Sequence, residues 1–304
     1  MLYSYAKLSA HDFGIFRILG TGLGQLLFPW ARFKATQKKY DLKPISPTWL
    51  QIRLGPILRN EQDKRFYNNL FKVPKDQVKG WEKLFLLSTL PRISETDFIF
   101  KDERGLSSAI VVFEGSIGYF STILKSHEMI KNELIRMTLD KHKNGLNYKF
   151  GLSITVHVRL GDFSVAPSQE IIEGGGLNTR LPLAWYVRVI NLIRSELGKE
   201  IPVHVFSDGT DEDLSDLLML PNTQRMGFGS SIADIFALSQ SRILIASSIF
   251  SMWASYIGRM PVIWHKGQLK QKLYFDNPTA EIEVGMNDEI PASFFGNVNT
   301  SANM

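Results

Sequence analysis

Three polar side chains follow closely on one another at the end of an apolar stretch. The run "GLSITVHVRLGD" contains His157, Arg159 and Asp162 within six residues. A guanidinium is always charged and can bind two phosphate oxygens at once, and Gly161 lets the backbone approach a ligand closely. These residue types predict an anion-binding site. They are equally compatible with a buried Arg159–Asp162 ion pair beside a hydrogen-bonded histidine.

The elements around these residues alternate between short apolar strands and helices. This alternation is typical of βαβ units in a parallel sheet, where ligands bind at the carboxyl ends of the strands. The polar strand ends read "HVRLGD", "FSDGTD" and "ASS". We expect strands at 151–158, 201–206, 242–247 and 261–265, and helices at 181–198, 211–220, 230–240 and 248–258.

Two further groups are expected near the same sheet edge. Ser247 and Ser248 stand where a strand gives way to a helix, and free N–H groups and hydroxyls at a helix start can bind an anion. Asp234, near the start of the preceding helix, can reach the edge of a base. A cationic fork, a serine-rich helix start and a carboxylate together suit a nucleoside diphosphate. Taken alone, the serines are also explained by helix capping.

The length of 304 residues predicts two domains. The first half contains a Gly-rich turn and helix, "GTGLGQLLFPWARFKATQKKY", and then an expected helix at 81–90, strand at 107–113 and helix at 127–143. We therefore expect an α/β domain over 1–146, a second over 147–279, and a polar tail over 280–304.

Composition excludes several classes of protein. The absence of cysteine excludes disulfides, thiolate metal sites and cysteine nucleophiles, and the sequence has no Walker A loop and no nucleophile elbow. The net charge of +5 permits nucleic acid, anionic lipid or a phosphorylated small molecule as ligand. Because the basic residues are spread out, we expect a solvated basic surface and no nucleic-acid site. No apolar run is long enough to span a membrane, so we expect a cytoplasmic protein.

Asp211 and Asp213 have two interpretations. A DxD pair after a strand can hold the divalent metal of a sugar-nucleotide transferase. Acidic residues in a first helical turn also offset the positive end of the helix dipole. We expect the second role, and therefore no metal site.

Four ordered motifs resemble a known superfamily. "HVRLGDF" resembles the HxRxGD signature of the α-1,2/α-1,6-fucosyltransferases and protein O-fucosyltransferases, and especially the α-1,2-fucosyltransferases of bacteria and animals (glycosyltransferase family 11). "GTGLGQLLFPWA" resembles the opening GGLGNQLF block of this family, and "VHVFSDGTD" its FSDD strand end. "DIFALSQSRILIASSIFSMWASYIG" is similar to its third motif. The resemblance spans about residues 14–265.

The resemblance implies an α/β, GT-B-like fold, in which two Rossmann-like domains face each other across a cleft. It implies GDP-fucose as the donor, held mainly by the C-terminal domain without a metal or other cofactor. By motif position, Arg159 would hold the β-phosphate, and His157 and Asp234 would lie by the guanosine. Ser247, Ser248 and Ser251 would line the phosphates, and Gly22 and Gly24 would bring the N-terminal loop close to the donor.

The sequence departs from the family pattern in several places but keeps Arg159, the expected phosphate ligand. The departures therefore bear more on the expected linkage and acceptor than on donor binding. The departures are Gln25 for Asn, with Leu26 after it, Leu160 for a second Arg, Phe163 for Tyr, and Gly209 for the second Asp of FSDD.

The expected reaction is inverting transfer of L-fucose from GDP-β-L-fucose to an acceptor oligosaccharide. The resemblance favours an α-1,2 linkage to galactose in bacterial surface polysaccharide or O-antigen synthesis. Arg159 and Asp162 are the catalytic candidates; Glu170 and Glu173 compete with Asp162 as general base. The loop 164–180 either covers the cleft or is a solvated excursion. The basic surface suits a lipid-linked acceptor and peripheral contact with the inner membrane.

Four alternatives stay open at this point. One is transfer of a different sugar from GDP on the same scaffold. Another is a metal-dependent transferase that uses Asp211 and Asp213. The third is a non-catalytic nucleotide- or glycan-binding protein, and the fourth is a basic nucleic-acid binder, whose affinity would fall steeply with salt.

Overall fold

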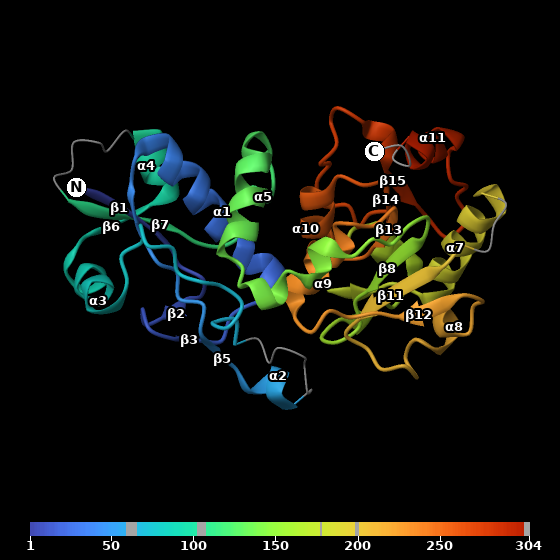
Figure 1. The fold of residues 1–304 in the computed structure, drawn as a ribbon, viewed down its shortest axis with the longest axis horizontal. Helices are drawn as coiled ribbons and strands as arrows, with labels where there is room; N and C mark the ends of the chain where they lie inside the picture. The colour runs from blue at the N-terminus through green and yellow to red at the C-terminus, as the bar shows by residue number, and fades with distance from the viewer. Residues whose placement is uncertain (59–65, 102–107, 177, 198–200, 301–304) are drawn as a thin grey trace. The chain divides into compact units, whose positions relative to one another are not determined.

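The chain folds into two compact α/β units, shown in the computed structural model of Figure 1. The structure describes residues 1–58, 66–101, 108–176, 178–197 and 201–300. Unit 1 contains residues 1–142 and 230–232, and unit 2 contains residues 143–229 and 233–304. Each unit is described by itself below.

A parallel sheet in the order β4-β1-β7-β6 forms the centre of unit 1. Its inner strands consist mainly of apolar residues that are buried or half-buried, as expected for strands covered on both faces. The strands are β1 (Leu2–Ala6), β4 (Lys43–Ile45), β6 (Arg92–Ser94) and β7 (Ala109–Phe113).

The helices of unit 1 and a small second sheet surround this centre. The helices expected in the first half are present, with shifted ends. Helix α5 ends earlier than expected, because the backbone of Thr138 is extended. The helices are α1 (Leu23–Tyr40), α2 (Leu54–Leu58), α3 (Gly80–Thr89), α4 (Glu95–Lys101) and α5 (His127–Met137). The small sheet has the order β2-β3-β5, formed by β2 (His11–Asp12), β3 (Arg17–Ile18) and β5 (Gln51–Ile52).

Unit 2 is built on a parallel sheet in the order β12-β11-β8-β13-β14-β15. In chain order this is 3-2-1-4-5-6, the order of a doubly wound Rossmann sheet. The α/β class, with a parallel sheet in each unit, is therefore confirmed. The strands are β8 (Ile154–Val158), β11 (Val203–Ser207), β12 (Thr223–Arg225), β13 (Ile243–Ala246), β14 (Val262–His265) and β15 (Glu281–Val284).

Helices cover both faces of this sheet, with α7 and α8 on one side and α9 and α10 on the other (Figure 1). Val156 and Val158 of β8 point into the apolar core shared with α7, α8 and α11. Since side chains alternate along a strand, His157 points to the opposite face, where α10 lies. The helices are α6 (Gln169–Glu173), α7 (Leu183–Leu197), α8 (Ser215–Leu218), α9 (Ser231–Leu238), α10 (Ile249–Gly258) and α11 (Ala292–Thr300).

The expectation of a tail over 280–304 is wrong for the residues that the structure describes. Strand β15 pairs in parallel with β14, and Glu281 lies opposite Val262. Helix α11 buries Phe294 and Val298 in the core of unit 2. The segment is polar on average, and its few apolar residues lie on one face of α11, so its composition did not indicate a buried helix. Residues 301–304 lie outside the described part.

No helix among the described residues is long and apolar enough to cross a membrane.

Candidate functional site

The strand order of unit 2 reverses between β8 and β13. These two strands are neighbours, and the chain winds outward from them in opposite directions. In open α/β sheets this reversal point is where ligands bind. His157 is the penultimate residue of β8, and Ser247 follows β13 directly, so both groups lie near this edge of the sheet.

His157 is enclosed between α10 and the sheet. Its side chain is 6% exposed, and its ring stacks on Phe250 with centroids 5.0 Å apart. Its Nδ1 lies 2.6 Å from Oγ of Ser251 and 3.5 Å from Oγ of Ser247. Burial lowers the pKa of His157 to about 4, with the charge of Asp208 opposing the shift and that of Arg159 adding to it. His157 is therefore neutral at pH 7 and acts as a hydrogen-bonding group.

Arg159 holds two carboxylates at the tip of β8. Its two terminal nitrogens donate to Asp162 and to Asp208, and its guanidinium lies over the ring of Phe163 at 5.4 Å. The predicted Arg159–Asp162 pair is thus present, although both side chains stay partly exposed. These two hydrogen bonds use two of the five N–H donors of the guanidinium, and the two carboxylates hold its position.

Asp208 is a site residue that the sequence reasoning did not select. It follows β11, and besides binding Arg159 it accepts a 2.8 Å hydrogen bond from the backbone N–H of Leu160. A Cβ on Gly161 would lie 2.2 Å from Oδ2 of Asp208. Gly161 is therefore needed for the close packing of Asp208 against the turn after β8. The sequence could have indicated this residue, because Asp208 directly follows β11, at the same sheet edge as Arg159.

The serine-rich turn is organised by internal hydrogen bonds. Ser248 is the N-cap of α10 and accepts from the backbone N–H of Phe250 at 3.3 Å. Ser251 is fully buried, bonds His157, and accepts from the N–H of Ser247 at 3.4 Å. Ser247 also hydrogen bonds the buried Tyr186 and restrains the rise in its pKa that burial causes. The structure thus joins His157, Ser247 and Ser251 in one cluster and places Ser248 at its edge.

Asp234 has a structural contact that the sequence did not predict. Its Oδ1 accepts a 2.6 Å hydrogen bond from the backbone N–H of Phe228. Phe228 stacks in parallel on Phe206, with centroids 6.1 Å apart. Asp234 therefore fixes the loop before α9, and its contact with a guanosine stays a prediction.

Gly22 and Gly24 belong to unit 1. Gly22 is the N-cap of α1, and a Cβ added there would meet no atom within 4 Å. Gly24 is buried in the first turn of α1. Their proximity to a donor bound by unit 2 stays a prediction.

The three candidate bases have different environments. Asp162 is bound to Arg159. The pKa of Glu170 is lowered by a hydrogen bond from Ser168, which makes this carboxylate a weaker base. Glu173 pairs with Lys266 at 3.6 Å.

The loop 164–180 is attached to the turn after β14. Nε2 of Gln268 donates to the carbonyl of Ile172 at 2.7 Å, and Nζ of Lys270 donates to the carbonyl of Gly175 at 2.9 Å. These contacts fix two points of the loop, while most of its described side chains stay exposed or half-buried, and a role as a cover of the cleft stays a prediction.

Asp211 and Asp213 have structural partners. Asp213 accepts from the backbone N–H and the hydroxyl of Thr210, both at 2.8 Å, and caps the turn that leads to α8. Asp211 pairs with Arg225. Within the part of the chain that the structure describes, no three His, Cys, Asp or Glu side chains are grouped as potential metal ligands.

Two of the departures from the family pattern are in contact. A Cβ on Gly209 would lie 2.5 Å from Cδ1 of Leu160. The buried Leu160 side chain therefore occupies the space beside Gly209. Nε of Arg180 donates to the carbonyls of Leu160 at 3.0 Å and Phe163 at 2.7 Å, which holds the turn in place.

Comparison with known proteins gives the following findings. No protein-family model matches the sequence, and no curated protein sequence is significantly similar to it. Among solved structures, the chain is similar to NodZ α-1,6-fucosyltransferase co-crystallized with GDP, at 12% identity and a TM-score of 0.49 over 86% of this chain and 95% of that one. It is similar to Arabidopsis thaliana FUT1 in complex with GDP at 11% identity and a TM-score of 0.49, over 86% and 70% of the two chains. It is also similar to POFUT1 in complex with GDP, at 11% identity and a TM-score of 0.44, over 92% of this chain and 100% of that one.

Proposed function

We propose that the chain is a glycosyltransferase that moves L-fucose from GDP-β-L-fucose to a hydroxyl of an acceptor glycan with inversion. The observation that supports this proposal is the position of the HVRLGD segment. It ends the strand at the reversal point of a Rossmann-type sheet, next to the serine-rich start of α10. A guanidinium, a capped helix start and a neutral imidazole meet there, and these groups suit a nucleoside diphosphate.

In the proposed reaction an acceptor oxygen attacks the anomeric carbon of fucose. The bond from that carbon to the β-phosphate oxygen breaks, and the electron pair leaves with GDP. The acceptor proton passes to a base, for which Asp162 is our candidate. Arg159 stabilises the negative charge that develops on the leaving phosphate, and preorganised donors of this kind are often the largest catalytic contribution.

The other assignments belong to the same proposal. His157 and Asp234 lie by the guanosine, and Ser247, Ser248 and Ser251 line the phosphates. Gly22 and Gly24 approach the donor from unit 1 in a GT-B arrangement, with residues 1–146 on the acceptor side and residues 147–279 binding the donor. We further propose an α-1,2 linkage to galactose, on a lipid-linked acceptor in the cytoplasm, as in O-antigen synthesis.

The test is release of GDP from GDP-fucose with galactose- and GlcNAc-terminated acceptors in the presence of EDTA. We expect acceptor-dependent turnover by the wild type and a loss of about a hundredfold to a thousandfold for Arg159→Ala. Arg159→Lys should fail as well, since a point charge does not replace the fork. Turnover only with another GDP-sugar would reassign the donor.

GDP binding separates the remaining outcomes. Binding without turnover on any acceptor would support a non-catalytic binding protein. Loss of activity in EDTA, restored by a divalent cation, would favour a metal-dependent transferase. Absence of GDP binding by the wild type would overturn the proposal.

A further inference from the structure

Helix α3 of unit 1 exposes large aromatic side chains on its outer face. Its inner face buries Lys83 and Leu86. Its outer face presents Trp81 and Phe85, one turn apart, which are 86% and 65% exposed. Two large aromatic side chains that are mostly exposed on successive turns of one helix are typical of an interaction surface.

The turn between β2 and β3 extends this apolar face. Phe13 and Ile15 at its tip are 56% and 62% exposed. Gly14 between them packs directly on α3, because a Cβ added there would lie 2.8 Å from Cδ2 of Leu84. The tip and the helix therefore form one continuous surface, the apolar patch, which consists of Phe13, Ile15, Trp81 and Phe85.

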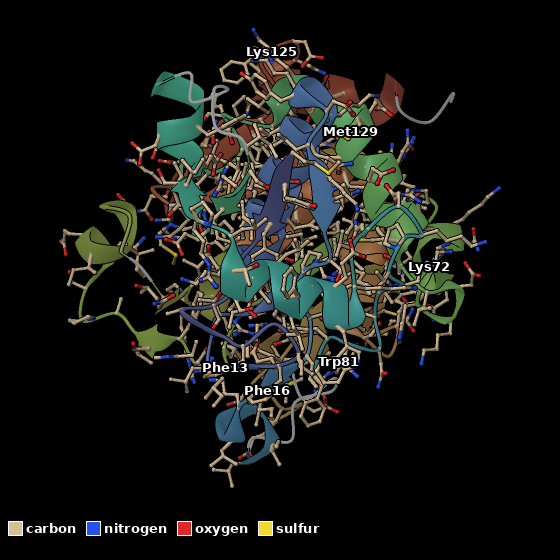
Figure 2. The ribbon with its side chains drawn as sticks, turned by 90° about the vertical axis from the view of Figure 1, so that its left-hand side faces the viewer. Phe13, Phe16, Lys72, Trp81, Lys125 and Met129 are labelled. Atoms are coloured by element: carbon tan, nitrogen blue, oxygen red, sulfur yellow. The ribbon has the colours of Figure 1, made fainter. Side chains whose placement is uncertain are left out.

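Figure 2 looks onto this side of unit 1 and shows the labelled Phe13, Phe16 and Trp81 beside α3. The rings of Phe13 and Phe16 are 5.3 Å apart, so the tip presents paired aromatic side chains. Lys72, which is labelled at the right-hand side of this view, belongs to the segment that leads along the chain into α3.

Positive charge is concentrated in the connection that leads into α3. Lys72, Lys75 and Lys79 are exposed there, and Asp76 is the acidic residue among them. Tryptophan and phenylalanine beside lysines are the side chains that insert into the headgroup region of a bilayer and attract anionic lipid. Exposed aromatic rings and these lysines together therefore match an anionic membrane surface.

We propose that the apolar patch and its lysines form a docking surface for an anionic lipid bilayer. Trp81, Phe85, Phe13 and Ile15 enter the boundary between headgroups and acyl chains, and the lysines contact the headgroups. This inference does not depend on the proposed transferase activity. If both hold, unit 1 is held at a surface that carries lipid-linked acceptors.

The experiment is co-sedimentation of the full chain with vesicles, either of phosphatidylcholine alone or of phosphatidylcholine with phosphatidylglycerol. We expect binding to the anionic vesicles that weakens with salt. Trp81→Ser combined with Phe85→Ser should lower the partition coefficient by about tenfold or more, since each aromatic loses its buried area in the lipid. Phe275→Ser is the matched control, because Phe275 is an aromatic side chain of unit 2 that is 69% exposed.

The charge contribution is tested by Lys72→Glu, Lys75→Glu and Lys79→Glu together. This triple variant should lose the preference for anionic vesicles. All variants are first compared with the wild type by urea unfolding, so that a folding defect is not mistaken for lost binding; if the serine double variant is unstable, Phe13→Ser alone replaces it. GDP binding should be unchanged in each variant.

Three results would overturn the proposal. The first is absence of wild-type binding to either vesicle. The second is equal binding by the wild type and the serine double variant. The third is concentration-dependent dimerisation that the double variant abolishes while vesicle binding is absent, which would assign the patch to a second copy of the chain.

Discussion

Replacing Gly161 with alanine should disrupt the turn after β8 without a change in charge. The added Cβ would lie 2.2 Å from Oδ2 and 3.0 Å from Cγ of Asp208. Because Asp208 is short, it can avoid the clash only by rotating, and rotation breaks its hydrogen bonds to the Leu160 N–H and to Arg159. A hydrogen bond to a charged acceptor contributes about 1.5–3 kcal/mol, whereas the partly exposed ion pair adds only about 0–1 kcal/mol.

We therefore expect Gly161→Ala to lower the free energy of unfolding by about 2–3 kcal/mol in urea titrations. Affinity for GDP, measured by calorimetric titration, should fall at least tenfold, or about 1.4 kcal/mol, because Arg159 loses one of its two anchors. Gly227→Ala is the matched control, since a Cβ there meets no atom within 4 Å. In an Asp208→Ala background the same glycine substitution should cost less than about 0.5 kcal/mol, because the clash is gone. Wild-type stability of Gly161→Ala would refute the reasoning.

Three further predictions follow from the geometry. The pKa of His157 is lowered from 6.5 to about 4 in the folded chain, so the unfolded chain takes up the proton first as the pH falls. The free energy of unfolding should therefore drop by about 2 kcal/mol between pH 7 and pH 5 in urea titrations. His157→Gln should remove this part of the pH dependence. Gly22→Ala should unfold like the wild type, because no atom lies within 4 Å of the new Cβ, but should lower turnover of GDP-fucose; unchanged turnover would contradict the assigned role of Gly22. Gly267→Ala should destabilise the chain by about 1–3 kcal/mol and expose the loop 164–180 to protease, since Gly267 has φ +80° and its Cβ would lie 2.0 Å from the carbonyl oxygen of Glu173; protease resistance equal to that of the wild type would count against this.

The sequence predicted the strands of unit 2 well because their residues are apolar and β-branched. Every residue of β8 is buried, so the apolar pattern directly reflects its environment. The short strand β12 and the strand β15 were missed, because each contains charged or polar residues and too few positions to show a period. Helix α8 is shorter than expected, because Asp213 caps a turn there and does not start a helix.

By itself, the sequence determined which residue types end each strand. His157, Arg159 and Ser247 could be placed at one sheet edge because the carboxyl ends of parallel strands share that edge. Their partners depend on strand order and side-chain packing, which a local pattern does not encode. Only the tertiary structure brings Asp208 to Arg159 and buries His157 against Ser251, since these contacts join residues 49 and 94 positions apart. It likewise exposes Trp81 and Phe85, whose apolar character would by itself predict burial.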